Sequence, residues 1–132
     1  MDIVITEWAL QSYLELRGRE FTNEEYWKNI RPDVELLKDF PSNSKFELSN
    51  FWGPCKDKSQ ARVPNCYKMK WHNIGPGRVQ LRLLVVFSDD MAYLCQAYVK
   101  RDEKVDKRQI AKIKIRAKLI ERGQVEIRGR LK

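Results

Sequence analysis

The feature that most constrains the fold is a run of three strand-like segments joined by short turns. Residues 66–72, 78–87 and 91–100 concentrate aromatic, β-branched and aliphatic side chains, often in alternation. The first connection, 73–77, contains two glycines that tolerate positive φ, and the second, 88–90, is short and polar as in a tight hairpin. The sequence therefore predicts an antiparallel three-stranded meander in the middle of the chain.

Two helices are expected in the N-terminal third. Thr6 can cap a first helix, whose apolar positions follow the 3.6-residue period as far as Gly18. Thr22 and Glu25 fit a capping box, so a second helix begins there. Pro32 either ends that helix or begins a further helical turn.

The rest of the chain contains a long loop and a basic helix. Residues 42–64 are interpreted as a loop with at most one short strand, whose aromatic side chains anchor it on the core. Asp106 can cap a helix over 107–122, after which 124–132 is either a short strand or a mobile tail. The predicted fold is one α+β domain over residues 1–132: two N-terminal helices packed on a small antiparallel meander, followed by a C-terminal basic helix.

Composition indicates an ordinary globular protein with free thiols. A length of 132 residues suits one domain with a modest core. The three cysteines, Cys55, Cys66 and Cys95, are widely spaced without a CxxC motif, which disfavours a disulfide framework or a zinc ribbon. The longest apolar run, Leu83–Phe87, is too short to span a bilayer, and the N-terminus does not read as an export signal. A cytoplasmic location is therefore expected.

The positive charge is concentrated at the C-terminal end. The net charge is +8, yet residues 1–50 carry a net −4 and residues 100–132 a net +8. A basic segment of this kind either gives a helix a solvated outer face or binds a polyanion. A phosphate backbone and an acidic protein partner would both suit it.

Cations also gather on the predicted meander. Lys68 and Lys70 alternate with apolar residues, and Arg78 and Arg82 share a face of the next strand. In an antiparallel pair these four side chains lie within a few residues of each other, where like charges repel unless an anion is bound. A phosphodiester is the obvious anion. The alternative is four solvated side chains on an exposed sheet face.

Motifs of other chemistries are absent from the sequence. His72 is the sole histidine, and there is no GxxxxGK[ST], GxGxxG or HExxH motif. No metal and no cofactor are therefore expected. An enzyme built on this chain would have to work through its cations.

Three segments resemble the RelE/ParE toxin superfamily, in particular its HigB and phage Gp49-like branch. They are the strand at 77–87, the strand at 91–99 followed by Lys100-Arg101, and the helical segment at 110–116. The resemblance covers about residues 66–118, and residues 3–40 by pattern alone.

The resemblance implies a toxin of a bacterial toxin–antitoxin system that is a ribosome-dependent mRNA endoribonuclease, or mRNA interferase. Its implied partners are the ribosome, mRNA and a cognate antitoxin protein. In this interpretation Lys68 or Lys70 is the general base, and Arg82 and Arg101 stabilise the strained phosphate. The residues expected to bind RNA are Arg78, Lys100, Lys104, Lys107 and Arg108.

One position departs from the family pattern, and two other functions stay open. Where RelE has a tyrosine early in its last helix, this chain has Lys107, which leaves Tyr93 and Tyr98 as candidate tyrosines. The first alternative is a non-nuclease ParE-like or phage-derived protein that binds a protein target. The second is a basic adaptor that binds RNA without cleaving it.

Overall fold

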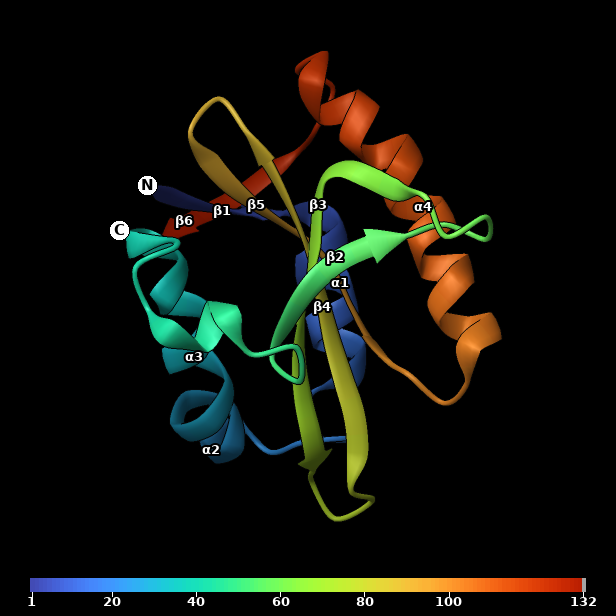
Figure 1. Ribbon diagram of the computed structural model, residues 1–132. Coiled ribbons are helices and arrows are strands. Elements are labelled where there is room, and N and C mark those ends of the chain that lie inside the picture. Colours follow the sequence, from blue (N-terminus) through green and yellow to red (C-terminus); the bar gives the residue numbers. More distant parts are fainter. Residues whose placement is uncertain (132) are drawn as a thin grey trace.

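A computed structural model describes residues 1–131 and shows one mixed β-sheet flanked by helices (Figure 1). Within that range six strands are hydrogen-bonded in the order β2-β3-β4-β5-β1-β6. They are β1 (Asp2–Thr6), β2 (Trp52–Lys56), β3 (Arg62–Ile74), β4 (Val79–Ser88), β5 (Met91–Val99) and β6 (Ile127–Leu131). Neighbouring strands from β2 to β5 are antiparallel, β1 is parallel to β5, and β6 is antiparallel to β1.

The predicted fold class, two N-terminal helices packed on a small antiparallel sheet with a basic C-terminal helix, is wrong. The meander is present as β3, β4 and β5, but it belongs to a larger mixed sheet that includes β1, and the last helix is followed by β6. Residues Asp2–Thr6 gave no clear strand signal because Ile3 and Val4 are both fully buried, in hydrophobic clusters on opposite faces. A strand buried on both faces lacks the alternation by which strands are recognised.

Helical segments cover both faces of the sheet. They are α1 (Glu7–Leu16), α2 (Asn23–Glu25), a π-helical turn η1 (Tyr26–Ile30), α3 (Arg31–Glu35), two 3₁₀ turns, η2 (Leu36–Asp39) and η3 (Ser44–Glu47), and α4 (Glu103–Glu121). The N-terminal segments pack on one face and α4 on the other; α3 and α4 lie on opposite sides of the strands in Figure 1. None of the helices among residues 1–131 has the length and apolar composition of a membrane span.

Several local predictions for the N-terminal segments are confirmed. Thr6 caps α1 by accepting a hydrogen bond from the Ala9 N–H at 3.2 Å, and its hydroxyl also donates to the Leu94 carbonyl at 2.7 Å. Thr22 and Glu25 form the expected capping box. Pro32 lies in the first turn of α3, so the helical run continues beyond it.

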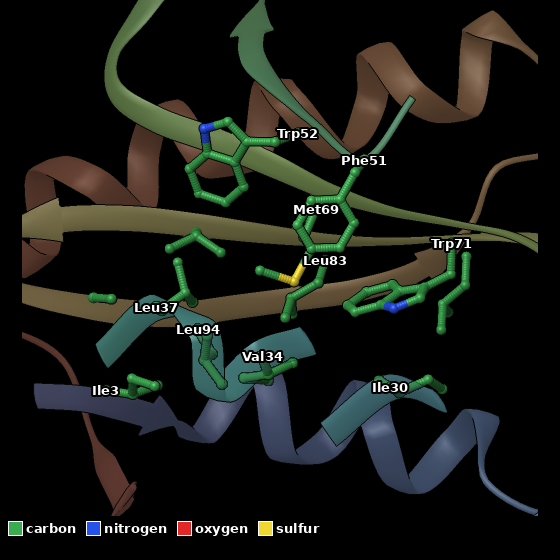
Figure 2. Close-up of a cluster of buried hydrophobic side chains, with 14 of the residues drawn as sticks. Ile3, Ile30, Val34, Leu37, Phe51, Trp52, Met69, Trp71, Leu83 and Leu94 are labelled. Carbon is green, nitrogen blue, oxygen red and sulfur yellow. The ribbon is translucent and has the colours of Figure 1, made fainter. Parts of the chain in front are cut away.

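The larger core lies on the α1 side of the sheet. In Figure 2, Met69, Leu83 and Leu94 from three strands point toward Val34 and Leu37 of the α3–η2 segment. The aromatic residues of the long loop join this core and are 7–8% exposed, as predicted; they are Phe46, Phe51 and Trp52. The loop is therefore fixed on the core, and it contains the short strand β2.

The smaller core lies beneath α4, which begins earlier than predicted. Asp102, not Asp106, caps the helix: its carboxylate accepts from the Val105 N–H at 2.9 Å. Asp106 is buried in the helix instead, because it lies on the same stripe as Ile110 and Ile113. After α4, the C-terminal segment forms a strand, β6, the first of the two alternatives left open by the sequence.

Candidate functional site

Lys68, Lys70 and Arg82 lie together on the face of the sheet that α4 covers. In the register of β3 and β4, Lys70 is directly opposite Arg82, and Lys68 is two residues away on the same strand, so their side chains leave the same face. Lys100 follows β5. Its N–H donates to the carbonyl of Gln80 at 2.8 Å, so the hydrogen bonding between β4 and β5 continues beyond Arg82 as far as Lys100. The structure thus brings together three of the four cations assigned to catalysis.

Two carboxylates from the first turn of α4 neutralise part of this cluster. Asp106, which is 1% exposed, accepts from Lys68 Nζ at 3.0 Å through Oδ2 and from the Tyr98 hydroxyl at 2.5 Å through Oδ1. Glu103 accepts from Lys100 Nζ at 2.7 Å. Of the four cations in this cluster, Lys68, Lys70, Arg82 and Lys100, two therefore have a carboxylate of the protein as partner: Lys68 and Lys100.

The electrostatics of Asp106 and Tyr98 follow from this contact. Burial tends to raise the pKa of Asp106, but the hydrogen bonds from Tyr98 and Lys68 and the nearby ammonium charges hold it below its ordinary value. Burial raises the pKa of Tyr98, and its hydrogen bond to Asp106 raises it further. Asp106 is therefore a carboxylate at neutral pH, and Tyr98 is a protonated phenol.

Lys70 and Arg82 are left without a carboxylate partner in the part of the chain that the structure describes. Lys70 Nζ donates to the Ser49 carbonyl at 2.8 Å. Arg82 is 7% exposed; its Nη1 donates to the carbonyls of Leu81 at 3.1 Å and Trp71 at 3.4 Å, while its Nε has no partner. A buried donor without a partner costs about 1–3 kcal/mol, which an arriving anion would recover.

The surroundings also change the proton affinity of the two cations. Burial lowers the pKa of Lys70, and the charges of Lys68, Arg82 and Lys100 lower it further. Burial likewise lowers the pKa of Arg82. Lys70 therefore loses its proton more readily than an ordinary surface lysine, while Arg82, like other arginines, remains a cation at neutral pH.

The other predicted site residues lie outside this cluster. Arg101 is 72% exposed and lies 4.0 Å from Glu20, in the segment between α1 and α2, so it does not join Arg82. Arg78 is exposed in the β3–β4 turn with φ of 51°. Three basic residues near the start of α4, Lys104, Lys107 and Arg108, border a surface groove together with Lys58 and two acidic residues.

Sequence reasoning missed Asp106 as a member of the site and did not fix the direction of Tyr98. The spacing of Asp106 with Ile110, Ile113 and Ala117 was a usable signal, because it places the carboxylate on the apolar stripe of the helix. A carboxylate on a buried stripe needs a cationic or hydrogen-bonding partner. For Tyr98 no such signal existed, because the β4–β5 register shifts between Leu84 and Val85.

Metal and thiol chemistry find little support in this site. Among residues 1–131 no group of three or more histidine, cysteine, aspartate or glutamate side chains is arranged to hold a metal ion. The three cysteines are free, as predicted. They are also buried, and burial raises the pKa of Cys55 and of Cys66 to about 12. Comparison with known proteins gives no family for this chain: neither a protein-family model nor a curated protein matches it. The cations and their partners are therefore the features that indicate a function.

Proposed function

We propose that the protein is an RNA endonuclease that holds a phosphodiester at Lys70 and Arg82, and that it acts as the ribosome-dependent mRNA interferase of a toxin–antitoxin pair. The observation that carries the proposal is the cross-strand pair of these two cations, packed beside Lys68 and Lys100 and without an ion pair of their own among residues 1–131. Like charges that lie opposite one another on two strands repel, and a bound anion would relieve that repulsion. The resemblance of residues 66–118 to RelE/ParE toxins supports RNA as the source of that anion.

The chemistry available to this arrangement is attack of a ribose 2′-hydroxyl on the adjacent phosphorus. A neutral Lys70 amine would take the proton of the attacking hydroxyl, and its lowered pKa makes that form more abundant near neutral pH. Arg82 would stabilise the charge that develops on the phosphorane oxygens; its Nε is buried and has no hydrogen-bond partner among residues 1–131, so the side chain must shift to donate to them. The products would be a 2′,3′-cyclic phosphate and a 5′-hydroxyl.

The groove at Lys104, Lys107 and Arg108, which has four basic and two acidic lining residues, offers further cations for phosphate contacts. Such contacts position a strand without reading its sequence. In this proposal the protein works in the cytoplasm, where ribosomes present single-stranded mRNA, and a cognate antitoxin covers the basic surface when the toxin is silent.

The test is cleavage of a defined mRNA bound to ribosomes. Wild type should cut the mRNA, and Arg82→Ala should cut it at least tenfold more slowly, because one buried donor to the transition state is lost. Arg130→Ala is the matched control: it removes the same charge from β6, the far edge strand of the sheet, and should cut at the wild-type rate.

Two results would overturn the proposal. Equal rates for wild type and Arg82→Ala would remove Arg82 from the reaction. Salt-sensitive RNA binding without cut ends, with or without ribosomes, would identify an RNA-binding adaptor in place of a nuclease.

A further inference from the structure

Lys68 and Lys70 are chemically similar side chains on one strand face, but the structure gives them different partners. Lys68 Nζ donates to the buried Asp106 carboxylate at 3.0 Å, whereas Lys70 Nζ donates only to the neutral carbonyl of Ser49 at 2.8 Å. Neighbouring titratable groups whose environments differ in this way are the usual basis of an acid–base pair.

Resting on the proposed nuclease function, we infer that Lys68 is the general acid of the reaction, that Lys70 is the general base, and that Asp106 is the positioning residue that separates their roles. The Asp106 carboxylate accepts from Lys68 Nζ at 3.0 Å, which holds the Lys68 side chain in place on the face that it shares with Lys70. Asp106 itself is buried and has both oxygens engaged, so it does not touch the substrate.

Tyr98 is excluded as the acid by the same contact. Its hydroxyl proton is directed at Asp106 Oδ1, and the side chain is 5% exposed. Tyr98 instead holds one carboxylate oxygen so that the other faces Lys68. The two lysines lie on β3 and face each other. The other charged groups that face them are Arg82 on β4, Lys100 after β5, and Asp106 and Glu103 on α4.

The proton balance of the step is complete with these two side chains. Lys70 Nζ takes the proton from the 2′-hydroxyl as O2′ forms a bond to phosphorus. The bond from phosphorus to O5′ breaks, and O5′ takes a proton from the Lys68 ammonium. Two residues apart on a strand, the two Cα atoms are separated by roughly 7 Å and the side chains leave the same face; the assignment requires Lys68 and Lys70 to turn from Asp106 and Ser49 toward the two ends of the phosphorane. Solvent then restores both protonation states.

The experiment compares an ordinary mRNA with one whose scissile linkage has sulfur in place of O5′, each bound to ribosomes. A thiolate leaves without being protonated, so cleavage of the sulfur linkage still needs the general base but no longer needs the general acid. Lys68→Met should slow cleavage of the oxygen linkage at least 100-fold and the sulfur linkage less than tenfold. Lys70→Met should slow both linkages at least 100-fold.

Asp106→Asn tests the positioning role, with Asp102→Asn as the matched control. Asparagine at 106 can still accept from Tyr98, so the variant should slow the oxygen linkage at least tenfold while the sulfur linkage is affected less. Asparagine at 102 preserves the helix cap and should leave both rates within twofold of wild type. A merely structural role of Asp106 would slow both linkages alike. If Lys68→Met does not fold, Lys68→Met/Asp106→Asn removes the acid without leaving a buried charge.

The outcomes separate the two proposals. If wild type cuts neither linkage, the nuclease function fails and this assignment with it. If wild type cuts both but sulfur restores Lys70→Met instead of Lys68→Met, the roles are reversed. If sulfur restores neither variant, Lys68 is not the acid, and the nuclease function stands without it.

Discussion

Removing Lys68 should destabilise the folded protein, because it leaves the Asp106 carboxylate buried with only Tyr98 as partner. Breaking one side of a buried ion pair costs about 3–5 kcal/mol. The Asp106 side chain is 1% exposed but the Lys68 side chain is 15% exposed, so the cost lies at the lower end of that range. Lys68→Met should lower the free energy of unfolding by about 3 kcal/mol. For a chain of this length that corresponds to a fall in Tm of roughly 10 °C.

The same pair makes the loss depend on pH. The folded state holds the pKa of Asp106 below its ordinary value of 3.8, so its stabilisation is present above that pH and is lost as the pH falls through the folded pKa. Lys68 is one cause of the lowered pKa. The difference in free energy of unfolding between wild type and Lys68→Met should therefore be largest at pH 7 and become smaller below about pH 4.

Urea unfolding followed by tryptophan fluorescence measures the change. Lys114→Met is the control: Lys114 is 50% exposed and its partner Asp57 is 23% exposed, so the pair is far less buried than Lys68–Asp106 and the unfolding midpoint should move much less. Replacing all three members, as Lys68→Met/Tyr98→Phe/Asp106→Leu, should recover most of the loss because no buried polar group is left. A loss below about 1 kcal/mol at pH 7, or a gap that persists in acid, would refute the reasoning.

Two further predictions follow from the turns and the site. Gly75→Ala should lower the free energy of unfolding by more than 2 kcal/mol, since φ is +70° and a Cβ would lie 1.9 Å from the Glu20 carbonyl oxygen. Gly18→Ala should lower it by only about 1–2 kcal/mol, because φ is +82° but no atom lies within 4 Å of the added Cβ. Chemical denaturation of both variants measures the difference. Lys100→Met should move the rising limb of the pH–rate profile to higher pH, because the charge of Lys100 lowers the pKa of Lys70, whose neutral form is the base; an unmoved limb in ribosomal cleavage assays would contradict this.

The sequence was informative where a pattern is local. The capping box at Thr22, the hairpin turn at 88–90 and the shared face of Lys68 and Lys70 each depend on residues within a few positions of one another, and the structure contains all three. The nearness of Lys68, Lys70 and Arg82 was also predicted, but the exact pair Lys70–Arg82 was not, because the β3–β4 register shifts between Trp71 and Ile74.

The sequence was uninformative where the partner is distant. The position of β1 beside β5 joins residues about ninety positions apart, and neither strand carries a signal for the other. Arg101 follows Lys100 directly, yet the two side chains separate, because Lys100 pairs with Glu103 on α4 and Arg101 lies beside Glu20. The partners of each cation therefore required the structure.

The proposed function requires the Arg82 Nε, which has no hydrogen-bond partner among residues 1–131, to donate to a phosphodiester when RNA is bound. NMR observation of arginine Nε–H signals during titration with a single-stranded 2′-O-methyl RNA, which cannot be cleaved, tests it directly. The Arg82 signal should shift saturably as its Nε gains an acceptor, while that of Arg128, already 3.1 Å from Glu7 on the far edge of the sheet, should stay in place. An Arg82 signal that does not move when the RNA is bound would contradict the account.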